Sequence, residues 1–166
     1  MICVVDANVW IDLSEGELLE EAFQLQSETG LSWMTPDLIL AEEVLSVSAS
    51  RLRELGVTER PLSGEELGRI PELSASYPRP SPKDLSLIVA AREEGGILVS
   101  GDGALRDAAS SEGLPVHGIL WVLDQLVEEE ITPGPRAASA LRAMLEAGSR
   151  LPASAVEKRL RRWEKS

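Results

Sequence analysis

The sequence predicts an α/β protein with a central parallel sheet of four or more strands and helices on both faces. Short apolar runs typical of buried strands alternate with segments whose apolar residues recur at helical spacing. The 166 residues are 43% hydrophobic and 27% charged, which is typical of a soluble globular domain. A chain of this length can bury a core large enough to fold without disulfides or a structural metal.

The first predicted strand and helix follow from the opening residues. Ile2–Val5 is an apolar, β-branched run, which predicts a buried strand of a parallel sheet. A helix is expected after this strand, because apolar residues recur at helical spacing from Leu18 onwards. We expect Asp12 or Ser14 to cap this helix and Gly30 to end it.

A second strand and helix are expected in the next segment. The apolar run Leu38–Ala41 follows Pro36 and predicts the strand, and the helix after it is expected to end at Gly56. Ser63–Glu66 fits a capping box for a short helix. The proline-rich segment Ile70–Pro82 is expected to form an extended connector that is too short to separate two domains.

The second half of the chain has stronger signals. Ser81 is predicted to cap a helix that begins at Pro82 and ends at Gly95 and Gly96. Ile97–Ser100 is predicted as the third buried strand. The remaining elements are expected to be a helix at 104–112, a short strand at 115–117, and helices at 119–130, 136–147 and 153–164.

Composition also limits the class and location of the protein. The single Cys3 lies in the apolar opening run, which predicts a buried thiol and excludes an internal disulfide. No apolar stretch approaches the roughly 20 residues of a membrane-spanning helix, and no basic segment precedes the first apolar run. We therefore expect a cytoplasmic protein without membrane attachment.

The charges are unevenly distributed. The chain has 16 basic and 28 acidic residues, a net charge of -12, yet residues 150–166 hold six basic and two acidic side chains. The body of the protein is therefore suited to binding cations and would repel a phosphate backbone at long range. The terminal helix is basic.

Four acidic residues are expected to meet at one edge of the sheet. Asp6 follows the first strand, Glu42 follows the second apolar run, Asp84 lies in the first turn of the third helix and Asp102 follows the third strand. Ligands bind at the carboxyl ends of parallel strands. Carboxylates gathered there repel one another unless cations neutralise them or their pKa values rise. Carboxylate oxygens are the ligands that Mg²⁺ and Mn²⁺ prefer, which predicts a metal site.

Each of these acids also has a simpler structural interpretation. Asp6 could serve only as a helix cap, Asp102 only as a turn residue, Asp84 only as a partner of a helix dipole and Glu42 only as a surface acid. Glu43 is an alternative to Glu42, since a shift of one residue in the end of the strand would exchange their directions.

Four segments resemble, in order and spacing, the four acidic motifs of PIN domains. They are 6–13 (DANVWIDL), 36–42 (PDLILAE), 83–91 (KDLSLIVAA) and 98–106 (LVSGDGALR). The segment 116–123 is similar to the strand and helix that complete such domains. The resemblance implies a three-layer α/β/α sandwich over residues 1–130, with residues 131–166 as a C-terminal helical extension packed on it or next to it.

The resemblance also implies a function. PIN domains include metal-dependent ribonucleases, frequently the toxin of a VapC-type toxin–antitoxin pair. Asp6, Glu42, Asp84 and Asp102 would then be the catalytic acids that bind Mg²⁺ or Mn²⁺, and Glu42 is preferred to Glu43 because the run LAE at 40–42 matches the motif. Asn8 and Ser100 match small polar positions that would orient an acid or a water. The expected partners are an RNA substrate, a second copy in a homodimer and an antitoxin protein.

Two other functions stay open. A PIN-like chain could serve as a binding or assembly module with weak or lost activity. An aspartyl-phosphate phosphotransfer domain fits less well, because Lys83 is the single lysine before the terminal helix and Asn8 stands where the phosphatases need a second Asp. The sequence has no G-x-G-x-x-G or P-loop motif, so no nucleotide cofactor is expected.

The remaining polar and aromatic candidates are assigned structural roles. We expect Asp12, Asp107 and Asp124 to be caps or surface acids and His117 to be structural. The four tryptophans are not spaced as a stacking platform for single strands, so they are expected in the core or at an interface; they are Trp10, Trp33, Trp121 and Trp163.

Overall fold

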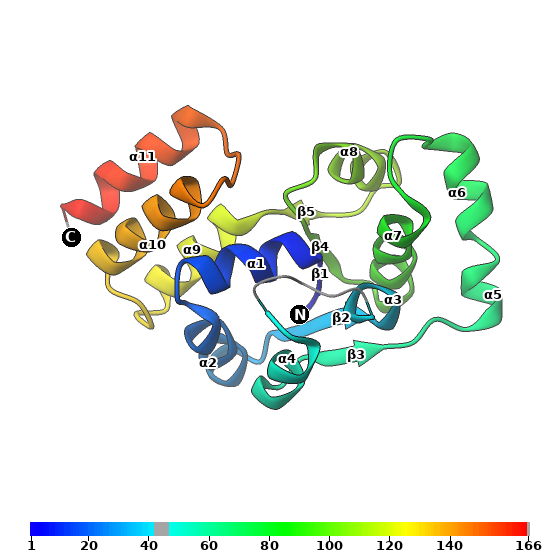
Figure 1. Cartoon of the computed structure of the whole chain (residues 1–166), viewed down its shortest axis with the longest axis horizontal. Coiled ribbons are helices and arrows are strands. Elements are labelled where there is room, and N and C mark those ends of the chain that lie inside the picture. Colours follow the sequence, from blue (N-terminus) through cyan, green and yellow to red (C-terminus); the bar gives the residue numbers. More distant parts are fainter. Residues whose placement is uncertain (42–46, 166) are drawn as a thin grey trace.

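The computed structural model describes residues 1–41 and 47–165, and its centre is a parallel sheet of five strands (Figure 1). The strand order is β3-β2-β1-β4-β5, and every neighbouring pair is parallel. The strands are β1 (Ile2–Val5), β2 (Ser32–Pro36), β3 (Thr58–Arg60), β4 (Ile97–Val99) and β5 (Val116–His117). The predicted parallel sheet of four or more strands is confirmed.

Helices cover both faces, and alternation along β1 divides the core into two layers. Cys3 and Val5 belong to the core cluster on one face, and Val4 belongs to the cluster on the other. The first cluster includes residues of α1 (Ala7–Glu15), α2 (Leu19–Thr29), α4 (Ala49–Leu55), α9 (Ile119–Glu128), α10 (Gly134–Glu146) and α11 (Ala153–Glu164). The second includes α3 (Asp37–Leu40), α6 (Ile70–Ser76), α7 (Pro82–Glu94) and α8 (Gly103–Ser111). The fold is an α/β/α sandwich.

The C-terminal helices share the core of the first face. Buried residues of α10 and α11, including Leu141, Met144, Val156 and Trp163, belong to the same cluster as α1. Gly16 lies so close to α10 that a Cβ atom there would meet the Met144 side chain at 2.7 Å. The segment after residue 130 thus packs directly on the first layer (Figure 1).

The predicted second strand is wrong. Leu38–Ala41 was expected to be the strand, but Asp37–Leu40 forms the short helix α3, and the strand β2 lies one segment earlier, at Ser32–Pro36. A short apolar run is equally compatible with a buried strand and a buried helix segment. The true strand contains the polar residue Thr35, which is fully buried. Its hydroxyl is satisfied there, because it accepts a hydrogen bond from Trp10 Nε1 at 3.0 Å and donates one to the Val5 carbonyl at 2.9 Å.

Two smaller expectations also fail, and one strand was not predicted. The single helix expected up to Gly30 is two helices: α1 begins at Ala7 and is capped by Asp6, not by Asp12 or Ser14, and α2 ends at Gly30 as expected. The segment expected as an extended connector contains the helix α6, with a proline in its first turn. The strand β3 was not predicted, since Thr58–Arg60 is a polar edge strand without an apolar run.

Several other elements are confirmed. Ser81 caps α7, which ends at Gly95 in the left-handed conformation, and β4, α8, β5 and the three last helices fall where they were expected. The Cys3 thiol is fully buried, which raises its pKa to about 12. Within the described residues, the helices are too short or too polar to cross a membrane.

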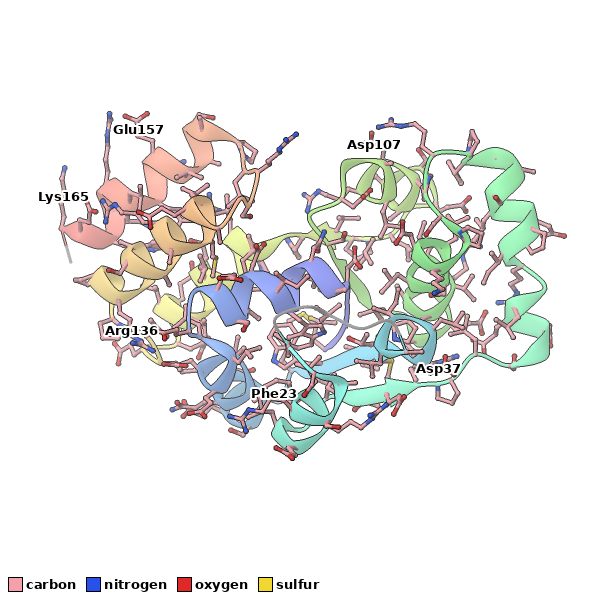
Figure 2. All side chains as sticks on the ribbon, viewed as in Figure 1. Phe23, Asp37, Asp107, Arg136, Glu157 and Lys165 are labelled. Carbon is pink, nitrogen blue, oxygen red and sulfur yellow. The ribbon has the colours of Figure 1, made fainter. Side chains whose placement is uncertain are left out.

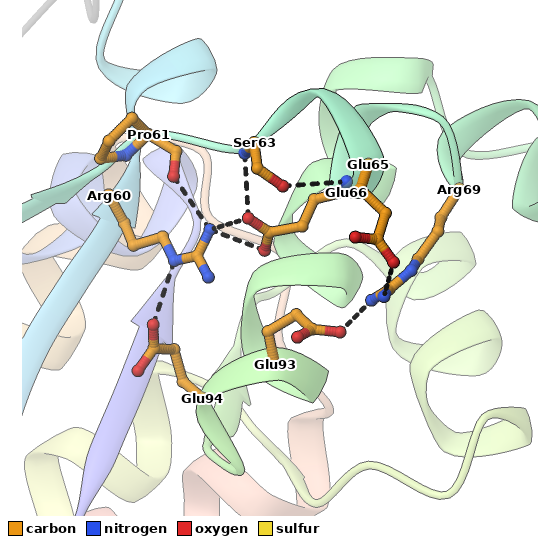
Figure 3. A network of polar contacts seen from close by, with 8 residues as sticks. All are labelled: Arg60, Pro61, Ser63, Glu65, Glu66, Arg69, Glu93 and Glu94. Carbon is orange, nitrogen blue, oxygen red and sulfur yellow. Dashed lines mark hydrogen bonds and ion pairs between the residues drawn. The ribbon is translucent and has the colours of Figure 1, made fainter.

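An ion-pair network closes the sheet at β3, and its residues are drawn in Figure 3. Arg60, the last residue of β3, contacts Glu66 at 2.7 Å and Glu94 at 3.1 Å. Glu66 also accepts a hydrogen bond from the Ser63 backbone at 2.9 Å, which completes the predicted capping box of α5 (Gly64–Leu67). Arg60 therefore joins the edge strand to α5 and to the end of α7.

Candidate active site at the carboxyl edge of the sheet

Asp6 lies at the point where β1 ends and α1 begins. Its Oδ1 accepts a hydrogen bond from the Ala7 amide at 2.7 Å, and its Oδ2 accepts one from Ser100 Oγ at 2.8 Å. The carboxyl group is buried, and burial is the largest cause that raises its pKa to about 6. The negative charges of Asp84 and Asp102 raise this pKa as well, while the two hydrogen bonds lower it.

Ser100 connects Asp6 to Asp102, although 94 residues separate it from Asp6. Its hydroxyl donates to Asp6 and accepts a hydrogen bond from the Asp102 amide at 3.1 Å. Asp102 caps α8, because its Oδ1 accepts from the Leu105 amide at 2.9 Å. The expected role of Ser100 in orienting an acid has a direct structural counterpart in these contacts.

Asp84 approaches the same edge from the first turn of α7. Its amide donates to Ser81 Oγ at 3.1 Å and its Oδ2 accepts from the Ser81 amide at 3.2 Å, which forms a reciprocal capping box. The helix start is therefore rigid. The charge of Asp84 adds to the effect of burial in raising the pKa of Asp6.

Asn8 and Arg106 hold the turn between β4 and α8. Asn8 Oδ1 accepts a hydrogen bond from the Gly101 amide at 3.3 Å. Arg106 Nη1 donates to the Ser100 carbonyl at 2.7 Å. Asn8 thus contacts the turn that precedes Asp102. The role expected for Asn8 was to orient an acid or a water, and this hydrogen bond reaches the acid only through the backbone.

A comparison with protein families now identifies the fold. The sequence profile of a family described as a PIN domain matches residues 2–165, which is nearly the whole chain. The chain belongs to the PIN domain family. Members of this family are generally nucleases and typically use divalent metals. A search of curated proteins finds no significant match.

The second predicted acid, Glu42, and its alternative Glu43 both lie outside the described residues. The corrected end of β2 brings another acid to the edge, because Asp37 begins α3 directly after that strand (Figure 2). The sequence signal for Asp37 was the same as for Asp6, an acid immediately after a strand, and it was missed because the strand was placed too late.

The donor atoms of the PIN domain suit a hard divalent cation. Asp84 Oδ1 and Asp102 Oδ2 make no hydrogen bond to any described residue, so both oxygens are available, and the Asp102 side chain is exposed. Within residues 1–41 and 47–165, no three His, Cys, Asp or Glu side chains lie close enough together to hold a metal ion as placed. The described residues therefore match Mg²⁺ or Mn²⁺ in chemistry and supply part of a ligand set.

The acids that were assigned structural roles lie elsewhere. Asp124 pairs with Arg159 at 2.6 Å and also with Arg162. Asp107 is exposed on α8 (Figure 2). Asp12 is half-buried and contacts Ser149 at 3.3 Å, and burial raises its pKa to about 6.

The aromatic residues of the PIN domain divide into two groups. Trp10, Trp33 and Trp163 are almost fully buried, as expected for core residues. Trp10 stacks on Phe23 with ring centroids 5.4 Å apart. Trp121 is only half-buried and stacks on His117, with centroids 4.5 Å apart.

Proposed function

We propose that this PIN domain is a metal-dependent endoribonuclease that hydrolyses phosphodiester bonds of RNA. The observation that supports the proposal best is the convergence of Asp6, Asp84 and Asp102, in which like charges help to raise the pKa of a buried carboxyl. A fold gains no stability from such repulsion, whereas a bound cation would relieve it.

The residues have distinct roles in this proposal. Asp6, Glu42, Asp84 and Asp102 would hold Mg²⁺ or Mn²⁺, which when bound supplies a water nucleophile at neutral pH and stabilises the leaving oxygen. Ser100 orients the Asp6 carboxylate and the amide of Asp102 at the same time. The two capping arrangements fix the backbone from which Asp84 and Asp102 project.

The test is cleavage of a mixed pool of single-stranded and structured RNA by the purified protein with Mn²⁺, Mg²⁺ or EDTA. We expect cutting with either metal and none in EDTA. An Asp6→Asn, Asp102→Asn double variant should lose at least about 10³-fold of the rate, since both proposed ligands become neutral. Asp107→Asn is the matched control, because it removes an exposed carboxylate from α8 and should leave the rate unchanged.

Two outcomes would contradict the nuclease. Absence of cutting with both metals, together with no metal-induced rise in melting temperature, would favour a PIN-like binding or assembly module instead. Equal loss of cutting in the double variant and in Asp107→Asn would mean that the site lies elsewhere.

The proposal extends to the biological role and to the partners. A VapC-type toxin would arrest growth when it is expressed alone, and a cognate antitoxin would relieve the arrest. Expression in a bacterial host, with the double variant as control, tests this role, and unaffected growth would contradict it. Sedimentation of the purified protein tests the proposed homodimer, which a single monomeric species would exclude.

A further inference from the structure

A groove of about 800 Å³ begins beside the proposed active site and runs towards the C-terminal helices. Gly101 and Gly103, the two neighbours of Asp102, line one end of it. The opposite wall is formed by residues 149–152, the connection between α10 and α11, and by the start of α11. The groove thus lies between the C-terminal helices and the turn that carries Asp102, and both neighbours of this acid line it.

The charge of this groove is opposite to that of the molecule. Although the protein has a net charge of -12, three arginines and not one carboxylate belong to the described residues that line the groove. The arginines are Arg106, Arg150 and Arg159. An electropositive lining in an acidic protein favours an anionic ligand at this place.

Two of the three guanidinium groups pair with no carboxylate of a described residue. Most arginines of the described chain pair with a carboxylate, as Arg159 does with Asp124. Arg150 is exposed and makes neither a hydrogen bond nor an ion pair with any described residue. Arg106 bonds a backbone carbonyl and no carboxylate within the described residues. Both can therefore bind phosphate oxygens without first breaking an ion pair.

Aromatic surface lies between these arginines. The stacked rings of His117 and Trp121 both line the groove, and the backbone of Gly118, the residue after His117, lies close to the Arg106 guanidinium group. Burial, and secondarily the charge of Arg106, lowers the pKa of His117, which disfavours a charged ring at this place. Nucleobases stack on aromatic side chains when they are not paired in a duplex.

We propose that this groove binds single-stranded RNA, with a phosphate on Arg150 and an unpaired base against Trp121, and leads the strand to Asp102. The inference rests on the proposed ribonuclease function, because it places the substrate beside that site. A protein segment fits less well, since the unpaired guanidinium groups and the aromatic pair together match alternating phosphates and bases. The acidic surface of the rest of the molecule, outside the basic helix α11, would repel other phosphates.

The experiment measures RNA binding separately from cleavage. Fluorescence anisotropy follows a labelled single-stranded RNA of about 12 nucleotides, of mixed sequence, binding to the full chain in EDTA. Trp121→Leu should weaken binding about tenfold, because a stacking surface is lost, and Trp121→Phe should restore most of the affinity. Arg150→Ala should weaken binding about fivefold and lower the salt slope by about one. A blunt RNA duplex should bind at least about tenfold more weakly than the single strand.

Lys158→Ala is the matched control. Lys158 lies on α11 in a hollow shared with Glu157 and Lys165, both labelled in Figure 2, and it does not line the groove. Its loss removes the same charge and should change the affinity less than twofold. The exposed Arg150 side chain makes no hydrogen bond or ion pair with any described residue, so Arg150→Ala tests the groove even if Trp121→Leu lowers stability.

The outcomes separate the two proposals. Groove-dependent RNA binding without cleavage in either metal would overturn the nuclease and leave the groove assignment in place. Cleavage with the same KM in wild type, Trp121→Leu and Arg150→Ala would overturn the groove assignment alone. Unchanged anisotropy in both groove variants, or equal affinity for the duplex, would also overturn it and favour a protein segment as the occupant.

Discussion

Two carboxylates at the carboxyl edge of the same parallel sheet have opposite electrostatic surroundings. Glu66 meets Arg60 at the end of β3, and this hydrogen-bonded ion pair lowers the pKa of Glu66 to about 2. Asp6 lies at the end of β1, where its hydrogen-bond partners are Ala7 and Ser100, and its pKa is raised to about 6. Both side chains are largely buried.

The difference lies in the partners rather than in burial. Near Glu66 the chain supplies its own cation, so the acid contributes to the fold. Near Asp6 the chain supplies two further acids, Asp84 and Asp102, so the ionised form of Asp6 is destabilised. The first arrangement is typical of a structural network, and the second is typical of a site that an external cation completes.

The largest stability effect is expected from removing the internal cation. Arg60→Ala leaves Glu66 without its cation, and since the two side chains are only 16% and 11% exposed, unfolding should become easier by about 3 kcal/mol. Urea denaturation at pH 7 measures this loss. An Arg60→Ala, Glu66→Gln double variant should recover part of it, because Glu66, the more buried of the two carboxylates that pair with Arg60, is then neutral. A loss below about 0.5 kcal/mol in Arg60→Ala would mean that this pair behaves as an exposed one.

Adding a divalent cation that binds at Asp6 and Asp102 should have a comparable effect. Mn²⁺ at about 100 times its dissociation constant should stabilise the wild type by about 2.7 kcal/mol. For a chain of this size, that corresponds to a rise in melting temperature of about 5–10 °C. The Asp6→Asn, Asp102→Asn double variant should show no rise.

Asp12→Asn is the control for metal stabilisation. Burial raises the pKa of Asp12 to about 6, as for Asp6, but Asp12 contacts Ser149 and does not contribute to the charge around Asp6. This variant should therefore keep the full response to Mn²⁺. If it loses the response as completely as the double variant, then the stabilisation by Mn²⁺ is not specific to Asp6 and Asp102.

Much of the fold could be predicted from sequence because the decisive signals were local. The start of α7 combines Ser81, Pro82 and Asp84 in three consecutive helix-start positions, and β1 and β4 are short apolar runs closed by polar residues. The segments that failed depend on tertiary contacts. Thr35 belongs to a buried strand only because Trp10 and the Val5 carbonyl satisfy its hydroxyl.

For the candidate site, the sequence predicted which acids lie at the sheet edge but not their contacts. Acids that follow parallel strands must meet at one edge, so Asp6 and Asp102 could be placed before the structure was known. The bond from Ser100 to Asp6 spans 94 residues and could be expected only as a general positioning role. The groove was not predicted, since its far wall is the connection between α10 and α11, whose position depends on how these helices pack on α1.

The pH dependence of stability provides a finer distinction between the two carboxylates. Since the pKa of Asp6 is about 6 in the folded protein and near 3.8 when unfolded, the folded state binds the proton more tightly, and stability is lost as pH rises from about 4 to about 6. Glu66 has the opposite sign, because its stabilisation is complete above pH 4.5 and is lost as pH falls towards 2.

Asp6→Asn isolates the first of these contributions. In EDTA, the variant and the wild type should be equally stable at pH 4, and by pH 7 the variant should be more stable by about 2 kcal/mol. Asp12 and His117 are present in both proteins, so their contributions cancel in the difference between the two free energies of unfolding. Chemical denaturation at several pH values measures it, and a difference independent of pH would show that the surroundings of Asp6 do not raise its pKa.

The smallest effect is expected for an ion pair that is present but exposed. Arg142 of α10 pairs with Glu164 of α11, and their side chains are 51% and 44% exposed, so water already solvates both charges. Arg142→Ala should change the free energy of unfolding by less than about 0.5 kcal/mol. The buried Met144 and Trp163 would then hold these helices together. If Arg142→Ala lowered the free energy of unfolding as much as Arg60→Ala, an exposed ion pair would stabilise the fold as strongly as the buried pair at β3. Burial could not then explain the contribution of the Arg60 network to stability.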